Sequence, residues 1–175
     1  MSKGLGQFER WILIHTYLKT VKKELPADWK YPRGYQRAKD RYANPRWADL
    51  RPRLDIHFSV WSEHLMRAEI LRNYFDLELS NRQSADDIVK ECFRQTPAYR
   101  AALASLLRTL KRLERKGLIE WHRWRLDHFP KDCFCYGNQW DGCQLTPNGV
   151  AAAEKFLSAN PWQNCHKLTL TDNDR

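Results

Sequence analysis

The side chains that could carry chemistry in this chain are of two kinds, cysteines near histidines and a dense set of arginines. They form no catalytic set, because the sequence has no phosphate-binding or dinucleotide-binding Gly-rich loop and no His-x-x-x-His pair. His57 and His64 stand near Asp55 and Glu63, but such pairs are common on surface helices. The sequence therefore predicts a binding protein and not an enzyme.

Three cysteines, Cys133, Cys135 and Cys143, occur near His128. Thiolates and histidine bind zinc, and the Cys-His pair at 165–166 is a second source of ligands. However, a Cys-x-Cys spacing lacks the gap of two to four residues that is typical of structural zinc sites. We expect no cofactor; zinc at these cysteines and a redox-sensing thiol are the alternatives. An odd total of five cysteines without a secretory signal argues against disulfides.

The basic residues are concentrated in two blocks. The net charge is +9 and the pI about 9.5. Residues 30–53 hold eight Lys/Arg against two Asp, and residues 100–125 hold eight against two Glu, so the rest of the chain is slightly acidic. Positive charge gathered in this way indicates a polyanionic partner, either nucleic acid or an anionic membrane surface. We expect nucleic acid.

The second block surrounds the best-marked helix of the sequence, residues 97–116. Thr96 is a favourable N-cap, Pro97 suits the first helical position, and Gly117 suits the residue after a helix. Leucines at helical spacing predict one buried face. The opposite face is predicted to carry Ala101, Ser105, Arg108, Arg112 and Arg115.

The segments on either side of this helix are predicted in a definite order. A helix over 84–93 precedes it after a short turn. A strand over 118–126, a loop or hairpin tip over 127–142, a return strand over 143–146 and a helix over 147–157 follow it. A helix-turn-helix followed by a two-stranded hairpin is the order of a winged helix.

Two motifs carry a resemblance to a known family. Residues 106–120, LLRTLKRLERKGLIE, resemble the recognition helix and first wing strand of MarR-type and PadR-type regulators. Residues 144–149, QLTPNG, resemble their exit from the wing. The resemblance covers 84–157. It implies a mainly α fold with a small β-hairpin wing, the winged helix-turn-helix, which binds double-stranded DNA as a homodimer.

The resemblance places the helix over 97–116 in the major groove, where its N-terminal half meets base edges and its C-terminal end meets phosphates. Small residues at 101, 104 and 105 would allow a deep fit. The expected base contacts are Tyr99, Arg100, Ala101, Ser105 and Arg108. The rest of the expected DNA-binding set is Thr109, Lys111, Arg112, Arg115, Lys116, Arg123 and Arg125.

Residues 26–58 differ from the rest of the chain. Four prolines and Gly34 interrupt any period, which predicts an inserted arm with at most short helices. Its mixture of Arg/Lys with Trp/Tyr suits base stacking or a clamp on a nucleic-acid backbone. It suits equally a loop wrapped on the domain with solvated arginines. In the first case the secondary DNA contacts are Arg33, Arg37, Lys39, Arg41 and Arg46.

The other segments complete the predicted organisation. Residues 1–25 contain a helix over 5–25 that is apolar on more than one side, a core or dimerisation helix. The domain proper, 59–160, begins with a helix over 59–75, and 161–175 form an irregular tail. No apolar run is long enough for a membrane span and no signal peptide is recognised, so we expect a cytoplasmic protein with no membrane partner.

The function expected from these features is sequence-specific binding of double-stranded DNA in transcription regulation. Two alternatives stay open. One is a winged-helix DNA binder in replication, partition or defence. The other is a winged helix used as a protein-interaction module, because a fold does not determine a function.

Overall fold

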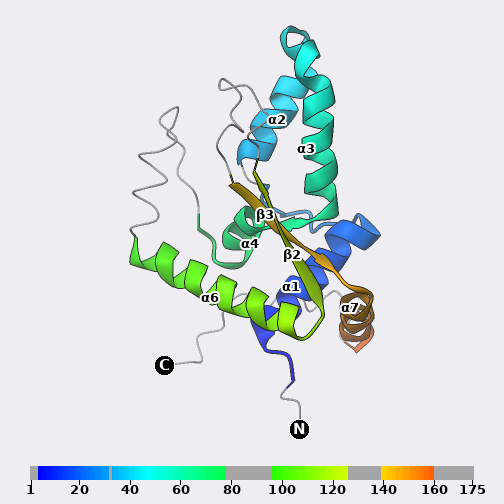
Figure 1. The fold of residues 1–175 in the computed structure, drawn as a ribbon, viewed down its shortest axis with the longest axis vertical. Helices are drawn as coiled ribbons and strands as arrows, with labels where there is room; N and C mark the ends of the chain where they lie inside the picture. Colours follow the sequence, from blue (N-terminus) through cyan, green and yellow to red (C-terminus); the bar gives the residue numbers. More distant parts are fainter. Residues whose placement is uncertain (1–3, 32, 78–95, 126–138, 160–175) are drawn as a thin grey trace.

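The computed structural model describes residues 4–31, 33–77, 96–125 and 139–159, which are mainly helical with one small three-stranded antiparallel sheet (Figure 1). The predicted helix over 84–93 and the tail over 161–175 lie outside these residues. The elements, in chain order, are α1 (Gln7–Tyr17), the π-helical turn η1 (Leu18–Lys22), α2 (Arg33–Ala43), the 3₁₀ helix η2 (Pro45–Leu50), α3 (Arg51–Glu63), β1 (Leu65–Met66), α4 (Arg67–Tyr74), α6 (Pro97–Arg115), β2 (Ile119–Arg125), β3 (Gln139–Leu145) and α7 (Pro147–Ala159).

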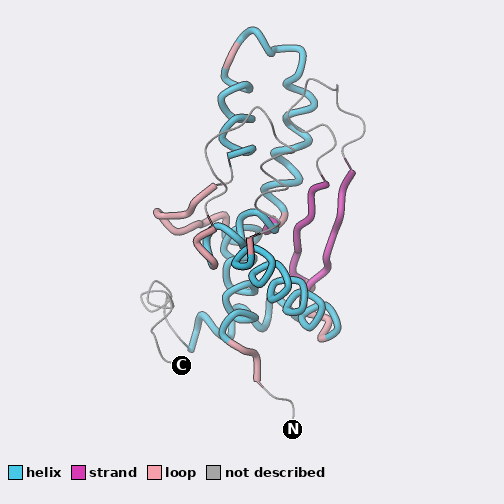
Figure 2. The backbone as a smooth tube through the Cα atoms, turned by 90° about the vertical axis from the view of Figure 1, so that its left-hand side faces the viewer, coloured by secondary structure: helices cyan, strands magenta, loops and turns pink. Residues whose placement is uncertain are grey.

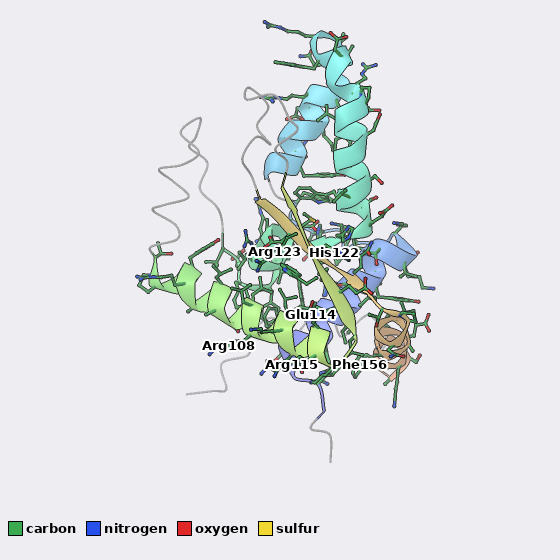
Figure 3. All side chains as sticks on the ribbon, in the orientation of Figure 1. Arg108, Glu114, Arg115, His122, Arg123 and Phe156 are labelled. Carbon is green, nitrogen blue, oxygen red and sulfur yellow. The ribbon has the colours of Figure 1, made fainter. Side chains whose placement is uncertain are left out.

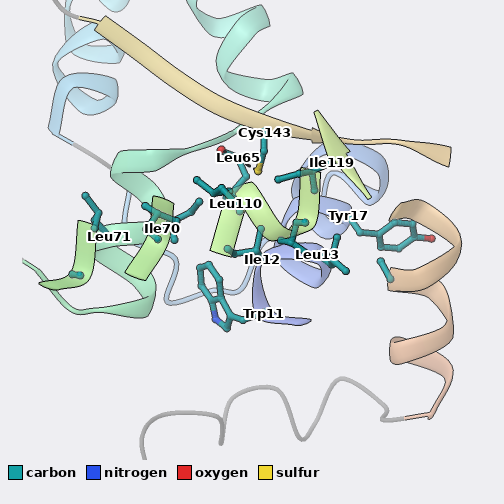
Figure 4. Packing of buried hydrophobic residues seen from close by; sticks show 14 of the residues in the cluster. Trp11, Ile12, Leu13, Tyr17, Leu65, Ile70, Leu71, Leu110, Ile119 and Cys143 are labelled. Carbon is teal, nitrogen blue, oxygen red and sulfur yellow. Dashed lines mark hydrogen bonds between the residues drawn. The ribbon is translucent and has the colours of Figure 1, made fainter. Parts of the chain in front are cut away.

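Helix α1 is the centre of the core. Every residue from 11 to 19 is buried, and α1 is in contact with α6, α7 and β3. Figure 4 shows Ile12 and Leu13 packed among residues of the neighbouring elements, including Leu110 and Ile119. Most of the broad apolar surface predicted for 5–25 is therefore covered within one chain, and Val21 is exposed. It provides no separate reason to expect a dimer.

The inserted arm predicted over 26–58 contains longer helices than the short ones expected. Helix α2 has 11 residues and α3 has 13, and with η2 between them they form a helical hairpin (residues 33–63) that projects from the body (Figures 1 and 2). Two of the four prolines, Pro45 and Pro52, misled the prediction because they stand in the first turns of helices. Pro45 begins η2 and Pro52 is the second residue of α3, where a missing N–H costs nothing.

The single helix predicted over 59–75 is wrong, because the segment divides into the end of α3, β1 and α4. Position 58/59, where the sequence separated the arm from the domain, falls inside α3. Two residues in the middle of the predicted helix, Leu65 and Met66, form β1, which pairs with Cys143 and Gly142 of β3. Gly142 permits this pairing because a Cβ there would lie 2.9 Å from Met66 Sδ. The strand depends on a partner far along the sequence, so local periodicity could not reveal it.

The hairpin β2–β3 is regular over its described length. Its register runs from Ile119 opposite Leu145 to Arg125 opposite Gln139, and the strand order β1-β3-β2 makes β3 central. The strand predicted over 118–126 is confirmed. The return strand predicted at 143–146 begins earlier, at Gln139, so the predicted loop over 127–142 was too long.

The two best-marked helices are confirmed, and one small network joins them. The Thr96 hydroxyl accepts from the Tyr99 N–H at the start of α6, and Gly117 follows α6 with a φ of 65°. The Thr146 hydroxyl donates to the Gly117 carbonyl at 2.6 Å and accepts from the Gly149 N–H at 3.1 Å. The start of α7 is thus bonded to the turn between α6 and β2.

None of the helices in the described part of the chain is both long and apolar enough to cross a membrane.

Candidate nucleic-acid interface

Helix α6 has one buried and one exposed face. Leu106, Leu110 and Leu113 are buried in the core. The side turned outward carries small and cationic residues, namely Ala101, Ala104, Arg108, Lys111 and Arg115, all exposed. Leu107 and Glu114 are exposed on this helix as well. In Figure 3 Arg108 and Arg115 point away from the body of the protein. The sequence predicted this cationic face, and Ala104 and Lys111 belong to it.

The expected base-contacting residues in the N-terminal half of α6 differ in exposure. Arg100 and Ala101 are exposed, whereas Tyr99 and Ser105 are half-buried, and Tyr99 packs against the core. Thr109 does not face outward, because it is only 2% exposed and its hydroxyl accepts from the Arg112 guanidinium at 3.2 Å. Thr109 therefore belongs to the core side of α6, in contrast to its expected role.

The Glu9 carboxylate of α1 forms ion pairs with two residues that were expected to contact DNA phosphates. Its Oε1 lies 3.2 Å from Arg112 Nε and 3.2 Å from Lys116 Nζ. The carboxylate also accepts from the Gly6 N–H at 2.9 Å, and Glu9 is only 4% exposed. Two cations at the C-terminal end of α6 are thus partly neutralised within the protein. Sequence reasoning missed this because the partners lie about a hundred residues apart.

Arg108, Lys111 and Arg115 lie outside the group of ion-paired residues formed by Glu9, Arg112 and Lys116. Arg115 Nε donates to the Lys111 carbonyl at 3.3 Å, which fixes the guanidinium along the helix surface. Lys111 and Arg108 are exposed on the same side. All three of these cations are exposed.

The strand β2 contributes less positive charge than its sequence suggests. Arg123 is exposed, and the side chain of Arg125 lies outside the described residues. Asp141 is buried on the neighbouring strand, 3.0 Å from Arg67. Burial raises the pKa of Asp141, although Arg67 and Arg123 act in the opposite direction. The Arg123 charge is therefore partly balanced by a nearby carboxyl group.

Cys143, one of the three cysteines weighed as zinc ligands, lies in the core. It is fully buried, its thiol lies 3.6 Å from the Thr16 hydroxyl, and it donates to the Leu65 carbonyl at 3.7 Å. Burial raises the pKa of the Cys143 thiol to about 12. Cys133 and Cys135 lie outside the described residues, and the described part holds no group of three metal-ligating side chains.

A buried polar cluster lies near Cys143 and was also missed. The Lys19 ammonium forms an ion pair with Glu69, and both side chains are buried. The indole N–H groups of Trp29 and Trp61 donate to Glu69 Oε1 at 3.3 Å, and the Met66 N–H donates to Oε2 at 2.9 Å. Burial lowers the pKa of Lys19, against the effect of Glu69. Every contact of this cluster is internal, so we assign it to the fold.

The secondary contacts fall on the projecting hairpin. Lys39 and Arg46 are exposed, and Arg41 is half-buried with its guanidinium 5.2 Å from the Trp47 ring centroid. The side chains of Arg33 and Arg37 lie outside the described residues.

No protein-family model, curated protein or solved structure matches this chain.

Proposed function

We propose that this protein is a winged-helix DNA-binding protein that reads a specific duplex sequence with the outward face of α6 and regulates transcription. The observation that carries the proposal is the composition of that face. Arg108, Lys111 and Arg115 are exposed together on one side of a helix whose other side is anchored in the core. An α-helix with such a face has the width and the charge required for the major groove of B-DNA.

The small residues of α6 support a close approach to bases. Ala104 and Ala101 are exposed one and two turns before Arg108, so these positions present little bulk. Arg108 then lies within the part of the helix that can reach base edges. A two-point contact of an arginine with guanine discriminates against a wrong base by about 1–3 kcal/mol.

The neighbouring elements support the winged-helix assignment. Helix α6 ends at a Gly117 turn and continues into an antiparallel hairpin, and β1 pairs with the free side of that hairpin. The segment that would form the first helix of the helix-turn-helix, 84–93, lies outside the described residues. The resemblance to MarR-type and PadR-type regulators also implies a homodimer. Sedimentation of the purified protein over a range of concentrations tests this.

The contacts of Glu9 assign different roles to the cations. Arg112 and Lys116 already have a carboxylate partner, so their gain from a phosphate is reduced. Arg115 and Lys111 are the principal phosphate contacts in this proposal, and Arg108 is the principal base contact.

The experiment compares Arg108→Ala with Arg115→Ala on duplexes selected by the wild-type protein from a random library. Arg108→Ala is expected to lower the preference for selected over random duplexes by roughly 5- to 150-fold, which corresponds to about 1–3 kcal/mol. Arg115→Ala is expected to weaken binding evenly and to lower the slope of log K against log salt by about 0.9. Lys155→Ala, an exposed cation on α7, is the control and should bind as the wild type does.

Equal effects of Arg108→Ala and Arg115→Ala on every sequence would contradict base reading by Arg108. Failure of the library to yield any preferred sequence, with binding that neither variant changes, would contradict DNA recognition by α6 altogether.

A further inference from the structure

The helical hairpin of residues 33–63 is a basic projection of the molecule. It holds seven Lys/Arg against four Asp/Glu, and all seven cations lie in its segment from 33 to 53. In both backbone views the hairpin extends along the long axis of the protein, away from α6 (Figures 1 and 2). Positive charges on this projecting hairpin can contact a partner that the rest of the protein does not touch.

Aromatic rings position the cations of this hairpin. Lys39 Nζ lies 5.5 Å from the Tyr35 ring centroid, and the Arg51 guanidinium lies 5.8 Å from that of Tyr42. The Arg41 guanidinium is held in the same way over Trp47. A ring face that holds a cation cannot stack a nucleic-acid base at the same time. The arrangement therefore favours contact with phosphates over base stacking.

The hairpin is anchored at its base. Tyr35 packs against Tyr31, with ring centroids 4.8 Å apart, and against Trp61, with centroids 5.3 Å apart. The Trp61 indole donates to the buried Glu69. The hairpin thus extends from a packed base, which holds the exposed Lys39, Arg46 and Arg51 at the surface on a helical frame.

The direction of the hairpin separates it from the α6 face. Arg108 and Arg115 point away from the body on the side opposite to the hairpin (Figure 3). A straight duplex lying along the outward face of α6 would therefore not reach the tip of the hairpin.

We propose that the hairpin is a second DNA-binding surface, which contacts the phosphate backbone of double-stranded DNA without sequence preference. One chain then holds two duplex segments, one on α6 and one on the hairpin. The joining of two duplexes rests on the proposed function of α6, whereas binding by the hairpin does not.

The test is a bridging assay with the full chain. A duplex of the selected sequence is fixed to beads, and capture of a second, fluorescent duplex of unrelated sequence is measured. The variant is Lys39→Gln/Arg46→Gln, which removes two exposed charges of the hairpin. The matched control is Lys22→Gln/Lys155→Gln, which removes two exposed charges from η1 and α7. Helical circular dichroism confirms that both variants are folded.

The hairpin variant is expected to lose capture of the second duplex at least about tenfold near physiological salt. Its affinity for unrelated duplex should also lose about one unit of salt slope for each charge removed. Affinity for the selected duplex should stay within about twofold, and the control should capture the second duplex as the wild type does.

Three results would overturn the proposal. In one, the hairpin variant captures the second duplex like the wild type, as it would if a dimer bridged through two α6 helices. In another, both double variants lose capture equally, which would indicate only an effect of total charge. In the third, single-stranded DNA displaces the second duplex more effectively than duplex does, which would assign the hairpin to single strands.

The α6 variant Arg108→Ala separates this proposal from the proposed function. If it abolishes sequence preference while Lys39→Gln/Arg46→Gln changes nothing, the hairpin proposal fails and the function of α6 stands. If the hairpin variant removes all duplex binding while Arg108→Ala changes nothing, the function of α6 fails and DNA binding by the hairpin stands.

Discussion

The Glu9 carboxylate on α1 lies 3.2 Å from the Arg112 guanidinium on α6, and this ion pair connects the first helix of the chain to the face proposed to bind DNA. Lys116 shares the same carboxylate. Glu9 is almost completely buried, whereas both cations are partly exposed. A phosphate that approaches this end of α6 must therefore compete with an internal anion that is already in place.

We predict that Glu9→Gln strengthens non-specific binding to DNA. Removal of the carboxylate charge releases Arg112 and Lys116 for phosphates, so the salt slope should become steeper by one to two units. Preference for the selected sequence should fall, since phosphates carry no sequence information. Loss of the charged hydrogen bonds should also destabilise the fold by roughly 1 kcal/mol, after allowance for screening of the exposed cations.

Titration of DNA at several salt concentrations checks this prediction. Glu114→Gln removes an exposed carboxylate from α6 itself and is the matched control. An equal gain in both variants would mean that only total charge matters and that Glu9 has no special role.

We predict that Gly149→Ala destabilises the protein severely. A Cβ at position 149 would lie 1.9 Å from the Leu118 carbonyl oxygen, so α7 would have to move away from the α6–β2 turn. The cost should be about 3 kcal/mol or more. Gly117→Ala should cost about 1 kcal/mol, because its φ of 65° is unfavourable for alanine but its surroundings are open. Gly4→Ala, with open space and no such φ, should cost less than about 0.5 kcal/mol.

Urea unfolding of these three variants gives the order directly. A Gly149→Ala protein as stable as Gly4→Ala would show that the close approach of α7 to the Leu118 carbonyl is not required.

We predict strong coupling between Lys19 and Glu69. Loss of either partner leaves a buried charge without its counter-ion, which costs about 3–5 kcal/mol. Lys19→Met and Glu69→Gln should each approach this range, and the double variant should cost clearly less than the sum. Lys22→Met, an exposed neighbour of Lys19, should have little effect. A double-mutant cycle measured by denaturant unfolding tests the coupling, and additive effects would contradict it.

We predict that His64 makes the protein less stable as the pH falls. Burial, with a contribution from the nearby His122, lowers the pKa of His64 below its ordinary value of 6.5, although its bond to the Val60 carbonyl opposes this. The unfolded chain therefore binds the proton more readily. The stability contribution is complete above about pH 6.5 and is lost as the pH falls from there through the folded-state pKa.

Unfolding free energies of the wild type and of His64→Asn between pH 5.5 and 7.5 check the sign. The wild type should lose stability toward acid more steeply than His64→Asn, whose side chain can still donate to the Val60 carbonyl. An equal or steeper loss in His64→Asn would show that another group is responsible.

The sequence predicted the elements whose signals are local. Thr96 and Gly117 mark the two ends of α6, which runs from Pro97 to Arg115, and the leucine spacing identifies its buried face. The pair Thr146-Pro147 marks the start of α7 in the same way. Each of these signals acts through hydrogen bonds or dihedral preferences inside a single turn, so no distant partner is needed to interpret it.

The features that were missed depend on distant partners. Strand β1 forms because Leu65 and Met66 pair with β3. The positive charge of α6 is partly neutralised because Glu9 forms an ion pair with Arg112. The helical hairpin was missed for a different reason. Pro45 and Pro52 were taken as breaks, whereas their positions are helix starts, and no long apolar stripe identified α2 as a helix.

The two ends of the segment that contains the hairpin are hydrogen-bonded to the same carboxylate oxygen. The chain leaves the core at Trp29 and returns at Trp61, and both indole groups donate to the same oxygen of Glu69. The entry and exit of this segment are therefore fixed by the body of the protein. Because the entropic cost of closing a loop grows only slowly with its length, shortening or extending the tip of the hairpin should have little effect on the core.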